Sequence, residues 1–212
     1  MRQFINAIGC YFIYIIAYFL VIAIFYFVGA VFNISENDID TNMVAIVSII
    51  ITTFFYSRFI PIFRNLKFTL KFSHIIILIA IGLCINFIFI MIINTDTVKY
   101  FFPSHNPKVR SIATDDNLLI TIVNTGLLVP FFEELLFREI IYSQFKERFS
   151  TNVSIVFQAL LFGVVHFNLL QIIYCFILGI LLGKVVEKTK TLISAIIIHA
   201  SISISSIIIM RL

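Results

Sequence analysis

The sequence predicts an all-α integral membrane protein, built as a bundle of about seven transmembrane helices with a polar intramembrane site on helices 4, 5 and 7. The first observation is composition: of the 212 residues, 61% are hydrophobic and 12% are charged, whereas a soluble domain carries about 25% charged residues. The second is clustering of the charges, which leaves long runs without Asp, Glu, Lys or Arg: 3–35, 41–57, 72–95, 117–132, 149–183 and 191–210. This pattern excludes a water-soluble fold and intrinsic disorder.

Each charge-free run is interpreted as one membrane-spanning helix, which needs about 20 mostly apolar residues. The exception is 149–183, which is too long for one span and indicates a hairpin of two helices. None of the runs alternates polar and apolar residues as the strands of a transmembrane barrel do. No repeat or linker divides the chain, so we expect a single transmembrane domain over residues 1–212.

Lys and Arg set the expected orientation, because they are enriched in cytoplasmic loops. The connections 58–71, 144–150 and 184–190 carry a basic excess, and the loop 33–42 carries acids without a base. We therefore expect a multi-pass protein with a cytoplasmic N-terminus and with 33–42 and 95–117 outside. We interpret the net charge of +4 as a sign of this topology. Binding to a nucleic acid would need a water-facing basic groove, so the expected partner is the lipid bilayer and not a nucleic acid.

Three helices are expected within residues 1–94, at about 6–32, 43–60 and 72–94. The second should end at Pro61, because proline cannot continue the hydrogen-bond ladder of a helix.

The fourth helix, at about 118–145, differs because it carries ionisable residues inside the membrane. At 1.5 Å per residue, Glu133 lies about 15 Å from the cytoplasmic end. A charge near the bilayer centre costs about 3 kcal/mol or more, so it usually marks a site. Glu134 and Arg138 have the i, i+4 spacing of a helical ion pair, which would leave Glu133 as the available carboxylate. The alternative is that these residues only satisfy one another as a structural cluster.

Two histidines occur at related depths. The run 149–183 leaves about 16 residues for each helix, too few for a hydrocarbon core of about 30 Å, so the turn near His166 should stop inside the membrane. His199, in the last helix, lies about 13 Å deep, and Ser203 follows one turn later on the same face. A lone intramembrane histidine usually only packs a bundle, but two of them near the depth of Glu133 favour a functional site.

Two other interpretations use the same residues. A zinc site would normally have paired histidines at i, i+4, as in HExxH, and the sequence has no such pair. We therefore expect no metal and no cofactor. A proton-coupled transporter would use the glutamates and histidines as a relay, but no inverted repeat is visible.

Three motifs occur in one order over about 118–206: EExxxR, FxxxH, and a glycine-containing helix followed by HxxxN. Their residues are Glu133, Glu134 and Arg138, then Phe162 and His166, then His199 with Ser203 at the Asn position. Taken together, they resemble the CPBP family of CAAX prenyl proteases and bacteriocin-processing enzymes, also called the Abi or type II CAAX endopeptidase family. The first three helices match this family only in being hydrophobic.

The resemblance implies a glutamate-dependent intramembrane endopeptidase that uses no metal. By analogy, the first glutamate of EExxxR and the histidine of FxxxH activate a water, and the second glutamate orients the helix with the arginine. His199 and Ser203 would stabilise the oxyanion of the tetrahedral intermediate. Ser203 departs from the family pattern, since a serine hydroxyl donates one hydrogen bond and reaches less far than an amide.

The small size of the chain resembles bacterial members of the family, so we expect a bacterial plasma membrane. Those members are associated with bacteriocin immunity, peptide maturation and membrane-protein processing. The expected substrate is a membrane-associated peptide or protein. The alternative function is that of a non-catalytic immunity or scaffold protein that binds a membrane partner on the same fold.

Overall fold

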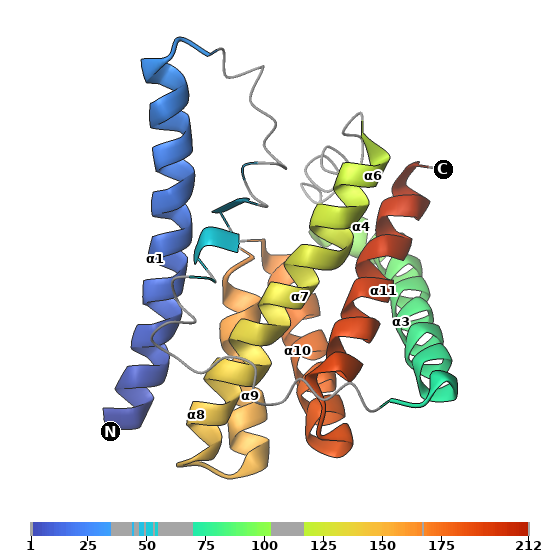
Figure 1. The fold of residues 1–212 in the computed structure, drawn as a ribbon. Helices are drawn as coiled ribbons and strands as arrows, with labels where there is room; N and C mark the ends of the chain where they lie inside the picture. Colours follow the sequence, from blue (N-terminus) through green and yellow to red (C-terminus); the bar gives the residue numbers. More distant parts are fainter. Residues whose placement is uncertain are drawn as a thin grey trace.

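The structure, a computed structural model, describes residues 2–34, 44, 47–48, 50–52, 54, 70–102, 117–166 and 168–211. Every regular element in these residues is helical, which confirms the all-α class for this part of the chain (Figure 1). In chain order they are α1 (Arg2–Val31), α3 (Phe72–Ile93), α4 (Asp96–Phe101), α6 (Leu118–Thr121), η2 (Ile122–Leu128), α7 (Val129–Glu134), η3 (Leu135–Ile141), α8 (Tyr142–Lys146), α9 (Thr151–Val164), α10 (Leu169–Thr189) and α11 (Leu192–Arg211).

Four helical stretches of the described residues are long and apolar enough to cross a membrane: α3, Leu118–Lys146, α10 and α11. Two further apolar stretches, Ile16–Val31 of α1 and the whole of α9, are shorter. The expected helix at 43–60 and its end at Pro61 lie largely outside the described residues, so the count of seven stays a prediction. Within the expected outer loop 95–117, the described part includes the short helix α4.

The elements α6, η2, α7, η3 and α8 are one continuous helix (Figure 1). Its bounds, Leu118–Lys146, agree with the expected helix at about 118–145. The turns η2 and η3 are π-helical and flank α7, which carries both glutamates of the first motif. Turns of π-helix are rare, and those that occur are often found at functional sites. Pro130, which has no N–H to donate, lies where η2 changes to α7.

The hairpin after this helix is less symmetrical than expected. Helix α9 has 14 residues and α10 has 21, in place of two helices of about 16. Most of the expected connection 184–190 belongs to the last turns of α10. Charged residues end an apolar run without ending the helix, and Lys184 and Lys188 are exposed on the surface of α10. At 1.5 Å per residue α9 spans about 21 Å, which is too short to cross a hydrocarbon core of about 30 Å.

Three glycines allow two helix pairs to approach closely. A Cβ atom on Gly179 would lie 2.9 Å from Ala159 Cα, and Gly183 also faces α9. These two glycines, one turn apart, let α10 pack closely on α9. Likewise, a Cβ atom on Gly82 would lie 2.7 Å from the carbonyl oxygen of Ile198, so α3 lies directly on α11 beside His199.

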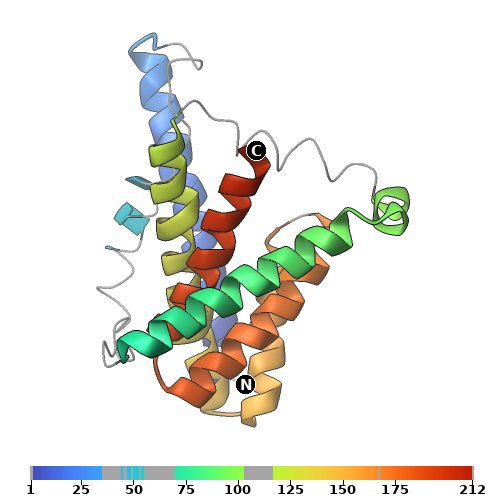
Figure 2. The ribbon, with the colours of Figure 1, turned by 90° about the vertical axis from the view of Figure 1, so that its right-hand side faces the viewer.

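Helix α11 is central to the C-terminal part of the bundle. It contacts α3, α10, η2 and α7, and Figure 2 shows α3 crossing it at an angle. Because α11 lies against the helix that carries Glu133, the last motif is placed beside the first.

The basic connections expected at 144–150 and 184–190 lie at the same end of the bundle. Lys146, at the end of α8, and Lys190, which caps α10, both form ion pairs with Glu187. Figure 1 shows the N-terminus and the start of α3 at this end as well. We call this end of the bundle, where Lys146, Lys190 and the start of α3 lie, the basic end.

Candidate active site

The two adjacent glutamates of α7 have different surroundings. The side chain of Glu134 is fully buried, with Oε2 3.0 Å from Arg138 Nε and Oε1 2.9 Å from His199 Nδ1. The side chain of Glu133 is 26% exposed and lines a cavity, and its Oε2 lies 3.7 Å from His199 Nε2. Both oxygens of Glu134 are therefore engaged, whereas Glu133 is the carboxylate that a ligand in the cavity can reach.

His199 joins the two motif helices. A carboxylate can only accept a hydrogen bond, so Nδ1 of the ring donates to Glu134. The distance of 3.7 Å between Nε2 and Glu133 exceeds a hydrogen bond, so Nε2 stays available on the cavity side. His199 is 8% exposed, and the close approach of α3 at Gly82 fixes the backbone beside it.

The cavity has a volume of about 290 Å³ and lies between α3, the continuous helix Leu118–Lys146, α10 and α11. Most of its lining is apolar. Four of the six expected site residues line it: Glu133, His166, His199 and Ser203. The other two, Glu134 and Arg138, do not line the cavity. Glu134 contacts His199, and Arg138 pairs with Glu134.

His166 lies in the turn that follows α9, is half-buried and lines the cavity. Its Nδ1 lies 2.9 Å from the carbonyl oxygen of Phe162. Because a carbonyl cannot donate, Nδ1 carries the proton of this hydrogen bond, and Nε2 of the neutral ring is left as an acceptor. The two residues of the FxxxH motif are thus joined by a hydrogen bond that sets the tautomer of the histidine.

The ring of Phe162 is fully buried at the centre of the site. Its centroid lies 4.4 Å from Cζ of Arg138, a cation–π contact. The rings of His166 and His199 lie edge-on to it, at centroid distances of 5.3 and 5.8 Å. Sequence analysis gave Phe162 no role, although its place in the motif was the available signal.

A polar contact between α3 and α11 was also missed. Asn86 is 1% exposed; its Nδ2 donates to Ser205 Oγ at 2.8 Å and its Oδ1 accepts from Ser206 Oγ at 2.8 Å. A buried asparagine within an otherwise apolar run was the signal that could have found it. The serines next to Ser203 thus hold helices together, and Ser203 itself lines the cavity one turn beyond His199.

No three of the described His, Cys, Asp and Glu side chains are grouped so that they could hold a metal ion. From the expected site residues the cavity brings together a carboxylate, two imidazoles and a hydroxyl, and its further polar lining residues are Thr125, Gln171, Tyr174 and Ser206. In a site of low water content, these groups can accept a proton and donate hydrogen bonds to a developing negative charge.

The chain was compared with protein families, curated proteins and solved structures. The model of the family described as Type II CAAX prenyl endopeptidase Rce1-like matches residues 115–205. None of the curated proteins and none of the solved structures matches the chain. The match contains all six expected site residues and leaves out α1 and α3. Residues 115–205 are therefore similar to the Rce1-like family, which is consistent with the resemblance to the CPBP family.

Proposed function

We propose that the protein is a glutamate-dependent intramembrane endopeptidase that hydrolyses a peptide bond of a membrane-associated peptide or protein. The observation that carries this proposal is the difference between the two glutamates. Glu134 is fully engaged, whereas Glu133 faces a cavity that also presents both motif histidines. The match to an endopeptidase family supports the reaction class.

In the proposed reaction, Glu133 and His166 activate a water held in the cavity. The water oxygen attacks the carbonyl carbon of the substrate, and its proton passes to the Glu133 carboxylate. General-base assistance of this kind contributes typically 10²–10⁴-fold to the rate. The same proton is then available for the leaving amine when the carbon–nitrogen bond breaks.

His199 and Ser203 stabilise the oxyanion that forms on the substrate carbonyl. Nε2 of His199 and the Ser203 hydroxyl border the same cavity, one helical turn apart. When Nδ1 donates to Glu134 and Nε2 donates to the oxyanion, the ring is an imidazolium ion beside the developing negative charge. One such donor in a site of this kind contributes about 2.7–4 kcal/mol to the transition state.

Glu134 and Arg138 act as positioning residues. The Arg138 guanidinium holds one oxygen of Glu134, and the other oxygen holds His199. The ion pair therefore fixes the orientation of the imidazole, a role like that of the buried carboxylate behind a catalytic histidine.

The lining of the cavity favours an apolar substrate segment. Phe89, Val129, Leu178, Ile202 and Ile207 form much of its wall, and an apolar wall selects apolar side chains or lipid groups. We place the protein in the plasma membrane of a bacterium with its N-terminus and basic end in the cytoplasm, where lysine and arginine are enriched. Peptide maturation or bacteriocin immunity are processes in which such a cleavage would act.

The test compares membrane proteins from cells that express the wild-type chain or Glu133→Gln at equal level. New N-termini of membrane-associated peptides or proteins are expected only with the wild type. Glu147→Gln is the control, because it makes the same change directly after the same helix and outside this cavity. If Glu133→Gln produces the same fragments and complements a deletion fully, the protein works as a non-catalytic scaffold and the proposal is wrong.

A further inference from the structure

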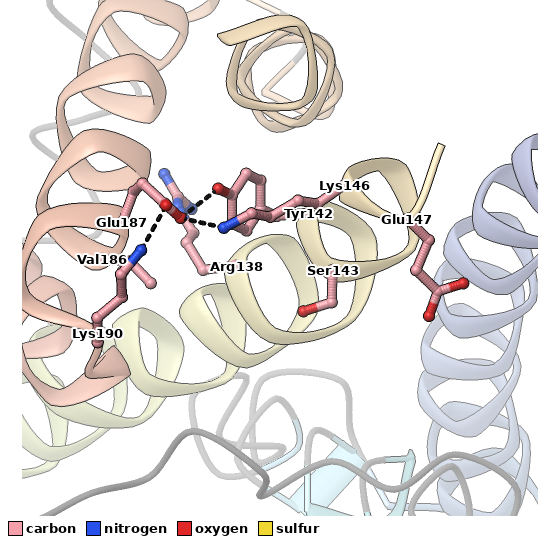
Figure 3. A pocket seen from close by; sticks show the side chains of 8 residues that line it. All are labelled: Arg138, Tyr142, Ser143, Lys146, Glu147, Val186, Glu187 and Lys190. Carbon is pink, nitrogen blue, oxygen red and sulfur yellow. Dashed lines mark hydrogen bonds and ion pairs between the residues drawn. The ribbon is translucent and has the colours of Figure 1, made fainter. Parts of the chain in front are cut away.

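A second cavity, of about 500 Å³, opens at the basic end between η3–α8 and the end of α10 (Figure 3). Its ionisable lining consists of Arg138, Tyr142, Lys146, Glu147, Glu187 and Lys190, that is, three cations, two carboxylates and a phenol. It shares no lining residue with the cavity at Glu133. It is therefore a separate cavity, although Arg138, which lines it, also pairs with Glu134 behind the site at Glu133.

Hydrogen-bond donors exceed acceptors around Glu187. Its carboxylate accepts from Lys146 Nζ and Lys190 Nζ, and from Tyr142 Oη at 2.7 Å. A lysine ammonium has three N–H groups, so each lysine keeps donors that Glu187 does not use. The side chains of Lys146 and Lys190 are 38% and 64% exposed, which leaves these donors accessible to a ligand.

Arg138 adds donors at the inner wall of this cavity. Its side chain is fully buried, and Nε faces Glu134. Its two terminal nitrogens, Nη1 and Nη2, have no hydrogen-bond partner in the described part of the chain. Figure 3 shows the guanidinium pointing toward the Glu187 cluster. Buried donors without acceptors are unfavourable, so a ligand that supplies oxygen atoms at this wall would be stabilised by them.

We propose that this cavity binds the phosphate headgroup of an anionic phospholipid. Phosphate oxygens accept several charge-assisted hydrogen bonds from arginine and lysine at once. Basic pockets between transmembrane helices, at the end where basic residues gather, bind such headgroups. The cavity lies at that end, between two helices that are long and apolar enough to span a membrane. A carboxylate of the peptide substrate is a less favoured ligand for this cavity, because the proposed cleavage takes place in the other cavity, at Glu133, which has a different lining.

The experiment uses the full chain purified in a neutral detergent, and measures thermal unfolding during titration with short-chain phosphatidylglycerol. Phosphatidylcholine and inorganic phosphate are titrated in parallel. The test variant is Lys146→Gln/Lys190→Gln. The control is Lys184→Gln/Lys188→Gln, which removes the same charge from the same end of the bundle, at exposed positions outside the cavity. Lys190→Gln alone keeps the Lys146–Glu187 pair, in case the double variant does not fold.

We expect saturable stabilisation of the wild type by phosphatidylglycerol and little by phosphatidylcholine. The affinity should fall about fivefold in Lys190→Gln and about thirtyfold in the double variant, and stay unchanged in the control. Equal losses in the test and control variants would contradict the proposal, since they would indicate attraction by surface charge alone. Equal stabilisation by inorganic phosphate would make free phosphate the ligand. Displacement by a peptide with a free C-terminal carboxylate, but not by its amide, would assign the cavity to the substrate.

Discussion

Removing one charge of the Glu134–Arg138 ion pair should destabilise the protein strongly, whereas removing both should cost much less than the sum. Both side chains are fully buried, and the two atoms in contact are 3.0 Å apart. The contact has the geometry of an ion pair and not of an aligned hydrogen bond. Each partner therefore depends on the other mainly for charge compensation. Breaking a buried pair by removing one partner costs about 3–5 kcal/mol, because an uncompensated charge stays behind.

The perturbation is a double-mutant cycle of Glu134→Gln, Arg138→Met and the two together. Each single variant should lose about 3–5 kcal/mol of unfolding free energy. The double variant should lose at least about 2 kcal/mol less than the sum of the singles, because interacting residues show coupling of about 0.5–3 kcal/mol. The free energy is measured by reversible denaturation in mixed micelles, with the exposed Lys184→Met as a control of near-zero effect. Additivity within about 0.5 kcal/mol would refute the reasoning.

Three further predictions concern single positions. If Ser203 is an oxyanion donor, Ser203→Ala should lower turnover by about a hundredfold at equal protein level, and Ser203→Asn should retain or raise it; peptide cleavage measures both. Asn86→Leu should lower the unfolding free energy by about 1–2 kcal/mol, because two interhelical hydrogen bonds of a buried amide are lost. Gly179→Ala should cost about 1–3 kcal/mol, since its Cβ would lie 2.9 Å from Ala159. Gly9→Ala is the matched control, because its Cβ would meet nothing within 4 Å.

The positions of the helices could be predicted where an uncharged run is long enough to span the bilayer. A run without charge must satisfy its backbone internally in a bilayer, so the run from 72 and the run from 117 give helices at the expected places. The end of α10 was not predictable in this way. Lys184, Glu187 and Lys188 end the apolar run, but they lie at the rim of the bundle, where a helix can continue in contact with water and headgroups.

The site was predictable within a helix and less so between helices. The i, i+4 spacing of Glu134 and Arg138 fixes their contact, and the turn between His199 and Ser203 places both on one face. His199 pairs with Glu134 because of how the two helices are rotated about their axes. The sequence indicated only the depth of these side chains in the membrane, and depth does not specify that rotation. The roles of Phe162 and Asn86 depend on packing between distant segments, for which a single sequence has no direct signal.

The most direct measurement of the central claim compares Glu133→Gln with Glu134→Gln in two readouts, peptide cleavage and unfolding free energy. Glu133→Gln should lower cleavage by a hundredfold or more, within the range of general-base assistance of about 10²–10⁴, and should leave the unfolding free energy nearly unchanged. Glu134→Gln should lower both, because it also releases Arg138 and His199. Cleavage by Glu133→Gln within tenfold of the wild type would contradict the assignment of Glu133 as the base.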